Sequence, residues 1–187
     1  MPESNGPVHF NLFLLPNFLD ADSCASLTSE LILAPTTQAP VYIEGAEGTI
    51  HETIRKTTSL HPSDATFWQV HEKLLKQKSA LEAHFATSLT DCERPQFLRY
   101  EKGDFFVRHQ DGNTQQLDFD HLRVRRISIV VFLNHSFSGG TLNFYDSTTT
   151  FPLKGETGLL VAFTADTFHE VVPVTSGERF TIISWFR

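Results

Sequence analysis

The stretch YEKGDFFVRHQDGN, residues 100–113, ends an apolar run with two side chains that can bind a metal ion. Side chains alternate along a strand, so His109 and Asp111 share one face while Arg108 and Gln110 share the other. A histidine and a carboxylate on one face fill a hydrophobic core poorly, because buried polar groups need partners. The pattern therefore predicts a strand that ends in a pair of metal ligands.

The bulk composition bounds the class of protein. The chain has 187 residues, with 40% hydrophobic and 20% charged, which is typical of a globular protein and favours a single domain over residues 1–187. The net charge of −7 disfavours nucleic acid and anionic membranes as partners. The two cysteines, Cys24 and Cys92, have no metal-binding spacing and are expected to be reduced thiols. Without a signal-peptide pattern or a long apolar segment, a cytoplasmic location is expected.

Residues 1–94 are predicted to form helices and strands that support the core of the protein. The expected elements are a strand in residues 9–16, a helix in 20–34 capped by Asp20 or Asp22, two strands in 41–60, and a long amphipathic helix in 61–89 with Asp64 as a cap. The glycine-containing segment 44–48 is read as a hairpin turn in preference to a mobile lid.

From Pro95 onward the pattern changes to strands. Eight short runs rich in β-branched and aromatic residues are separated by turn segments such as EKG, SGG and TSGE. This spacing predicts a mainly β fold, with a jelly-roll (double-stranded β-helix) core in residues 95–187 and helices buttressing one face.

A third metal ligand is expected at His169, which an apolar strand and a turn place at the start of another strand. Ten residues later Arg179 opens the run RFTIISWF, in which it shares a face with Thr181, Ile183 and Trp185. A buried guanidinium needs an anionic partner, and its fork geometry suits a carboxylate. Two histidines and one carboxylate that leave coordination positions open suit non-haem Fe(II).

With these residues in view, the sequence resembles the 2-oxoglutarate- and Fe(II)-dependent dioxygenases, in particular their prolyl-4-hydroxylase-like branch. The resemblance covers about residues 96–187. It rests on RYEKGDFFVRHQD, RISIVVFLN, SGGTLNFY and FHEVVPVTSGERFTIISWF. It implies His109, Asp111 and His169 as iron ligands, Arg179 as the anchor of the far carboxylate of 2-oxoglutarate, and Tyr100 as a hydrogen-bonding group in the co-substrate pocket.

The chain departs from this family at Phe132, where some members have a second tyrosine for the same carboxylate. Arg179, with help from Thr181, is therefore expected to hold the carboxylate alone. Asp111 stands where halogenating members have a small residue, so hydroxylation is the expected outcome. From its place in a strand, Arg126 is a candidate for binding a substrate carboxylate, against the equal alternative of a solvated arginine.

The resemblance also implies the reaction and its cofactors. These are Fe(II), 2-oxoglutarate as co-substrate, O₂, and ascorbate as an additional candidate. The expected reaction hydroxylates a prolyl residue or another amino-acid side chain and releases succinate and CO₂. The substrate is expected to be a peptide, a protein or a free amino acid.

Three alternatives stay open at this point. The first is a non-catalytic sensor module that binds iron and 2-oxoglutarate without turnover, and the second is a dioxygenase of a small metabolite. The third is a metal-binding jelly roll of the cupin kind, which the single His-x-Asp pair and the arginine disfavour.

Overall fold

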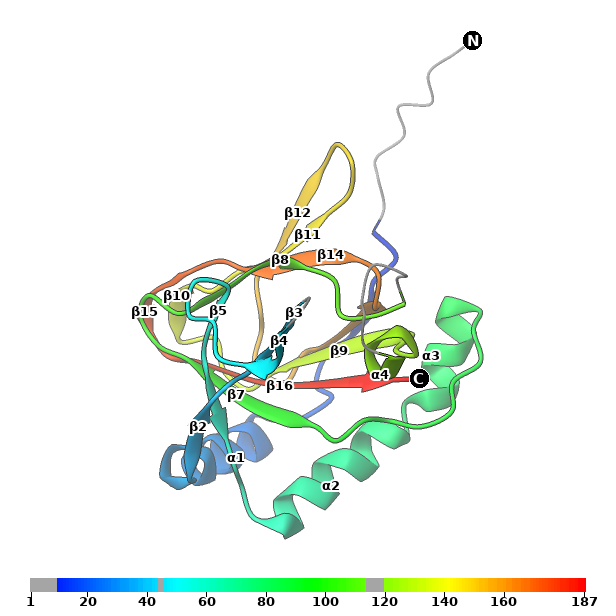
Figure 1. Ribbon diagram of the computed structural model, residues 1–187. Helices are drawn as coiled ribbons and strands as arrows, with labels where there is room; N and C mark the ends of the chain where they lie inside the picture. Colours follow the sequence, from blue (N-terminus) through cyan, green and yellow to red (C-terminus); the bar gives the residue numbers. More distant parts are fainter. Residues whose placement is uncertain (1–9, 44–45, 114–119) are drawn as a thin grey trace.

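The computed structural model describes residues 10–43, 46–113 and 120–187, and two antiparallel sheets dominate it (Figure 1). In spatial order, the seven-stranded sheet contains β1 (Phe13–Leu15), β13 (Leu160–Thr164), β9 (Ile127–Phe132), β16 (Arg179–Phe186), β7 (Gln96–Tyr100), β6 (Thr58–Leu60) and β2 (Thr36–Gln38). The five-stranded sheet contains β12 (Thr150–Leu153), β11 (Leu142–Tyr145), β14 (Phe168–Val171), β8 (Phe105–His109) and β5 (Arg55–Lys56). Together the sheets form the predicted jelly-roll core.

The sheets face one another across a hydrophobic layer. Side chains from both sheets meet there, including Leu98, Val130, Phe144, Phe163 and Val171, all of which are buried. The period of two in β9 and β16 sends alternate side chains to this layer and to the opposite face of the larger sheet. The strands β13, β9, β16 and β7 of the larger sheet therefore contribute to two cores.

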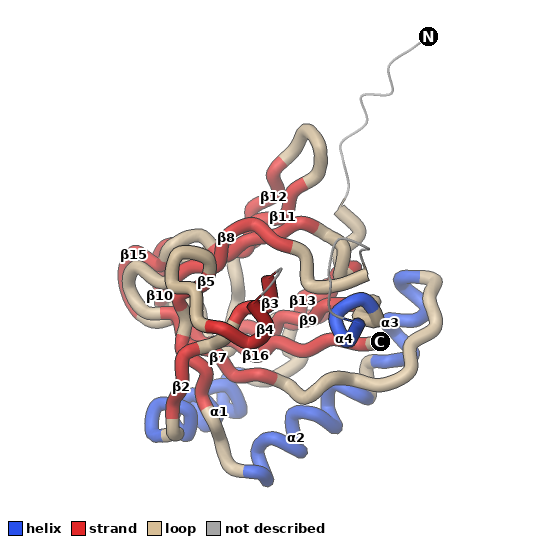
Figure 2. The backbone as a smooth tube through the Cα atoms, in the orientation of Figure 1, coloured by secondary structure: helices blue, strands red, loops and turns tan. Residues whose placement is uncertain are grey.

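The second core lies between the seven-stranded sheet and the helices. Figure 2 shows α1 (Ala21–Leu33) and α2 (Asp64–Leu75) on the side of this sheet that faces away from β8 and β14. Leu31 from α1, Leu74 from α2 and Leu81 from α3 (Lys78–Phe85) are fully buried against Val131 and Ile182. The predicted buttressing helices are thus confirmed. Among the described residues, no helix has both the length and the apolarity needed to cross a membrane.

The helix predicted over residues 61–89 is divided in two. α2 ends at Leu75 and α3 begins at Lys78, with no glycine or proline between them to signal the break. The cap of α2 is Ser63, whose Oγ accepts a hydrogen bond from the Thr66 backbone N–H at 3.3 Å, whereas Asp64 is the first helical residue. Asp20 caps α1, one of the two residues expected there.

Smaller strand pairs complete the fold. β10 (Phe137–Gly139) pairs with β15 (Val174–Gly177), and β3 (Val41–Ile43) pairs with β4 (Ala46–Thr49). The two strands predicted over residues 41–60 are therefore four, because β5 and β6 follow this hairpin and join the two large sheets. Residues 44 and 45, at the turn of this hairpin, lie outside the described residues. A single turn of helix, α4 (Asp120–Arg123), precedes β9. Both cysteines, Cys24 and Cys92, are buried and free.

Gly158 joins the helical layer to the jelly roll, and its replacement by alanine is expected to destabilise the protein. Its carbonyl accepts from the Leu19 N–H, its φ is +79°, and a Cβ there would collide with the Leu19 carbonyl oxygen. Gly158→Ala therefore incurs both backbone strain and overpacking, about 2–5 kcal/mol in total. Urea denaturation measures this loss in free energy of unfolding.

Gly103→Ala is the matched control for this substitution. Gly103 has a φ of +88°, but no atom lies within 4 Å of the position that a Cβ would occupy, so only the backbone term of about 1–2 kcal/mol applies. Equal losses in the two variants would contradict the proposed close contact between Gly158 and Leu19.

Candidate metal centre

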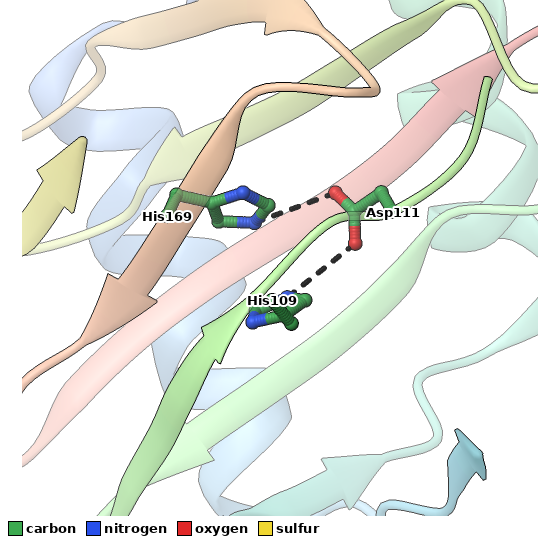
Figure 3. Close-up of side chains that lie close together, drawn as sticks. All are labelled: His109, Asp111 and His169. Carbon is green, nitrogen blue, oxygen red and sulfur yellow. Dashed lines mark ion pairs between the residues drawn. The ribbon is translucent and has the colours of Figure 1, made fainter. Parts of the chain in front are cut away.

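Two neighbouring strands place a pair of histidines opposite each other. His109 ends β8 and His169 lies in β14, and the two residues are direct partners in the antiparallel register. Their ring centroids lie 4.2 Å apart. Asp111 follows β8, and Figure 3 shows its carboxylate facing both imidazoles. The potential ligand atoms of the three residues all lie within 4.8 Å of one another, which is close enough to hold one metal ion.

Backbone carbonyls fix the orientation of both imidazole rings. His109 Nδ1 lies 2.7 Å from the Val107 carbonyl oxygen, and His169 Nδ1 lies 2.9 Å from that of Thr167. Because a carbonyl only accepts, each Nδ1 carries the proton and donates it. Each Nε2 lone pair is then free to face Asp111, from whose carboxylate oxygens both Nε2 atoms lie at 3.5 Å. Such outer hydrogen bonds are what set the tautomer of a metal-binding histidine.

The carboxylate of Asp111 is fixed by the opposite sheet. Ser128, a buried residue of β9, donates its hydroxyl to Asp111 Oδ2 at 2.7 Å. The backbone N–H groups of Asp111 and Gly112 both donate to the Ala165 carbonyl, at 2.9 and 3.0 Å. A Cβ on Gly112 would collide with the Leu122 carbonyl, so only glycine fits at this position. Asp111 is thus held at both its backbone and its side chain.

The protonation states of the cluster suit metal binding. Burial alone would raise the pKa of Asp111, but the neighbouring histidines and Arg125 outweigh it and hold the pKa well below its usual range. Burial, with a smaller effect from His109, lowers the pKa of His169 to about 4. At neutral pH the carboxylate is ionised and His169 is neutral. These are the forms that bind a metal.

Arg179 lies deeper between the sheets and lacks an acidic partner among the described residues. It is 1% exposed, and Nη1 donates to Thr181 Oγ1 at 3.3 Å, whereas Nε is buried without a hydrogen-bond partner. Its Cζ lies 5.0 Å from the ring centroids of both Tyr100 and Phe132. Burial lowers the Arg179 pKa to about 10, so it remains a cation at neutral pH. Gly140 leaves room for it, since a Cβ there would lie 3.0 Å from Arg179 Cδ.

A cavity of about 680 Å³ connects these groups. Its lining includes all five residues expected at the iron and co-substrate sites: Tyr100, His109, Asp111, His169 and Arg179. Ile183 and Trp185 also line it, which agrees with the face of the last strand predicted from the alternation of its side chains. The sheets thus bring a metal-binding cluster and a buried cation to one cavity.

Arg126 does not line this cavity. It is exposed and donates to Asn113 Oδ1 at 2.6 Å, so its predicted contact with substrate has no support from its position. The adjacent Arg125 lines the cavity instead and stacks over Trp185, with Cζ 3.6 Å from the ring centroid. The predicted alternation put Arg126 on the inner face; its backbone is already hydrogen-bonded to Phe186 and Ala165, but its side chain reaches Asn113 instead of the cavity.

Sequence reasoning also missed Ser128 and Phe106. Phe106 stacks on the His109 ring with the centroids 3.6 Å apart. A serine in a buried β9 strand, where its neighbours are aliphatic, was the signal that could have indicated a polar partner across the barrel.

Comparisons with known proteins agree with this site. Residues 95–187 match the family model described as the 2OG-Fe(II) oxygenase superfamily. A PKHD-type hydroxylase of Shewanella sp. strain MR-4 is 26% identical over 181 residues, covering 94% of this chain and 78% of the relative.

Solved structures share the fold. A Pseudomonas putida prolyl-4-hydroxylase superposes with a TM-score of 0.74 at 24% identity, over 95% of this chain and 92% of the other. A prolyl hydroxylase from Trichoplax adhaerens was solved in complex with a peptide fragment of the hypoxia inducible factor oxygen degradation domain. It superposes with a TM-score of 0.73 at 16% identity, over 94% of this chain and 83% of the other.

Removal of the Ser128 hydroxyl is expected to weaken metal binding. Without the hydrogen bond to Oδ2, the Asp111 carboxylate is free to rotate, and loss of such an outer contact typically costs about tenfold or more in metal affinity. Calorimetric titration of Ser128→Ala with Mn(II), a redox-stable probe, measures this change.

Ser184→Ala provides the matched control, because Ser184 is also buried but donates to the Glu93 carbonyl on the other face of the sheet. Mn(II) affinity is expected to be unchanged in this variant. Equal affinity in wild type and Ser128→Ala would show that the hydroxyl does not position the carboxylate.

Proposed function

The chain belongs, through residues 95–187, to the 2OG-Fe(II) oxygenase superfamily, and we propose that this Fe(II)- and 2-oxoglutarate-dependent hydroxylase acts on prolyl residues. The observation that carries the proposal is that one cavity holds a cluster of two histidines and one carboxylate together with Arg179, a buried arginine that has no acidic partner among the described residues. The names of the relatives support the prolyl substrate, since they include a prolyl-4-hydroxylase and PKHD-type hydroxylases.

The proposed iron ligands are His109, Asp111 and His169. Two imidazole nitrogens and one carboxylate oxygen are the donor set that non-haem Fe(II) enzymes use, and this set leaves positions open for a co-substrate and O₂. The neutral histidine and the ionised aspartate are ready for the ion without loss of a proton. The residues therefore fit the metal that the family requires.

Arg179 is the proposed anchor of the far carboxylate of 2-oxoglutarate. Its guanidinium donates one hydrogen bond to the Thr181 hydroxyl and lies beside the rings of Tyr100 and Phe132. Its remaining donors are therefore left for an anion. We propose Tyr100, a buried residue that lines the cavity, as a second hydrogen-bonding group for the same co-substrate. Phe132 has no hydroxyl to offer, so the anchor depends on Arg179.

The chain's own residues hold the reactants and exclude water. When bound, Fe(II) and 2-oxoglutarate supply the oxidation of a C–H bond by O₂, with succinate and CO₂ as the other products. Phe106, Val130 and Ile183 line the cavity with apolar surface beside the cluster, which keeps the reacting carbon in a dry pocket. The fixed Nδ1 donors of both histidines keep their Nε2 atoms directed at the metal.

Other predictions extend this proposal. The helices α1, α2 and α3 share one hydrophobic cluster with the larger sheet, which supports a single domain over residues 1–187. Ascorbate as an additional cofactor and a cytoplasmic location stay predictions. The first is tested by adding ascorbate to the turnover assay.

The decisive experiment measures 2-oxoglutarate consumption and product formation by the purified protein with Fe(II), O₂ and a library of proline-containing peptides. We expect succinate to form together with peptides that gain one oxygen atom at proline. A protein that binds Fe(II) and 2-oxoglutarate but never oxidises a substrate would instead be the sensor module considered above.

Loss of the aspartate is expected to abolish turnover. Asp111→Ala removes one of three proposed ligands and leaves the other two without their anionic partner, so Fe(II)-dependent succinate formation should fall below detection. Circular dichroism should still show a folded protein. Asp166→Ala, which removes a nearby exposed carboxylate, serves as the control and should retain activity. Activity close to wild type in Asp111→Ala would exclude Asp111 as a ligand.

Loss of the arginine is expected to affect the co-substrate rather than the metal. Arg179→Ala removes the charge-assisted hydrogen bonds to the far carboxylate, so the KM for 2-oxoglutarate should rise about tenfold or more while Mn(II) affinity stays within about twofold. Arg179→Lys keeps the positive charge but lacks the forked donors of the guanidinium, so its KM for 2-oxoglutarate should lie between those of wild type and Arg179→Ala. An unchanged KM in Arg179→Ala would mean that another group anchors the co-substrate.

A further inference from the structure

Four arginines line the cavity, and three of them have evident roles. The four are Arg55, Arg94, Arg125 and Arg179. Arg125 is neutralised by Glu93, to which it donates through Nε and Nη2 at 2.9 and 2.7 Å. Arg94 is exposed to solvent, and Arg179 is the proposed co-substrate anchor. The role of Arg55 is not explained by the proposed function.

Arg55 is a buried cation without an anion. It is 7% exposed, and within the described part of the chain its side chain makes one hydrogen bond, from Nη1 to the Pro40 carbonyl oxygen at 3.1 Å. Its Nε and Nη2 are buried, and neither has a hydrogen-bond partner. No acidic side chain of the described residues forms an ion pair with it. An unpaired buried charge is costly, because its desolvation is not offset by a partner.

The register of β5 places this cation beside the proposed iron site. Arg55 pairs with Phe106 of β8, and its Cζ lies 4.9 Å from the Phe106 ring centroid. The same ring stacks on that of His109, at a centroid distance of 3.6 Å. The two distances together place the guanidinium within about 8.5 Å of the His109 ring. One aromatic ring thus separates Arg55 from a proposed ligand.

When Fe(II) and 2-oxoglutarate are bound, the positive charge of Arg55 is the one that no other charge of the site balances. The charges of Fe(II), Asp111, the 2-oxoglutarate dianion and Arg179 add to zero, and the Arg125–Glu93 pair is neutral by itself. The exposed Asp64 and Arg94, which also line the cavity, cancel each other, so a second anion inside the cavity would compensate Arg55. The substrate is the component of the reaction that remains to supply it.

We propose that Arg55 binds a carboxylate of the substrate, placed a few bonds from the carbon that is oxidised. This inference rests on the proposed hydroxylase function and specifies its substrate class. A guanidinium fork with two free donors matches a carboxylate. Two sources offer that group: the α-carboxylate of a free or C-terminal proline, and an acidic side chain next to a prolyl residue in a peptide.

A purely structural role accounts less well for this side chain. The Arg55 side chain gains one hydrogen bond to Pro40 and one cation–π contact with Phe106, and neither contact neutralises its charge. A methionine would fill similar space without burying a charge. Arg55→Met is therefore expected to melt no lower than wild type while losing affinity for the carboxylate, a combination that a structural arginine would not give.

The test compares binding of acids with binding of their amides. Wild type is first saturated with Mn(II) and 2-oxoglutarate, so that Arg179 is occupied, and is then titrated with L-proline, L-prolinamide, and peptides in which proline is followed by Glu or by Gln. We expect at least one acid to bind about tenfold more tightly than its amide, and this preference to vanish in Arg55→Gln and Arg55→Met. The preferred pair identifies the source of the carboxylate.

Lys102→Gln is the matched control, since it removes one exposed positive charge from the turn between β7 and β8. This variant should keep the preference for the acid. Equal binding of every acid and amide to wild type, or a preference that persists without Arg55, would overturn the inference. So would weaker 2-oxoglutarate binding in Arg55→Gln, which would assign Arg55 to the co-substrate. Failure of Mn(II) and 2-oxoglutarate to bind wild type would instead contradict the proposed function.

Discussion

The antiparallel pairing of β8 with β14 is the constraint on which the site depends. It sets His109 directly opposite His169, so that residues 60 positions apart in the chain present their imidazoles to one point. A slip of one residue in this register would turn one histidine to the outer face. The buried side chains between the sheets fix that register, because each slip would also expose them. The hydrophobic layer is thus what secures the polar cluster at its edge.

The cavity carries charge that the fold alone does not need. Arg55 and Arg179 are both buried without acidic partners among the described residues, although unpaired charges weaken a folded protein. By contrast, Arg125 is paired with Glu93 and Lys56 lies 3.3 Å from Asp104, as is usual for ionic groups near a core. We propose that at these two arginines binding, rather than stability, determines the residue.

The sequence allowed much of the fold and the central site residues to be predicted, and the reason is local. Alternation within one strand relates His109 to Asp111, and the ten-residue step from His169 to Arg179 contains only the end of β14 and the short strand β15 with its connections. The two sheets and the supporting helices followed from periodicity in the same way. The expected iron and co-substrate residues do line one cavity, while their roles stay proposals.

What could not be predicted involves contacts across the barrel. The Ser128 hydroxyl reaches Asp111 from the opposite sheet, and Arg55 reaches the cavity through its pairing with β8, from about 50 residues away in sequence. Arg55 lies outside the motifs of the family resemblance, and Ser128 lies within RISIVVFLN without a ligand spacing that would mark it. The side chain of Arg126 bonds to Asn113 instead of lining the cavity, which alternation along one strand does not reveal, and the break between α2 and α3 has no glycine or proline to announce it.

The rigid anchoring of Asp111 has a consequence for metal choice. Its backbone, its carboxylate and both imidazoles are already fixed by hydrogen bonds, so an arriving ion finds the proposed ligands in place and gains no selectivity from rearranging them. Nitrogen and oxygen donors bind Co²⁺, Ni²⁺, Cu²⁺ and Zn²⁺ more tightly than Fe²⁺. Such a site cannot reject these competitors by affinity. Its identity as an iron centre would then be set by which metals the cell leaves free, and traces of zinc or copper would act as inhibitors that occupy it.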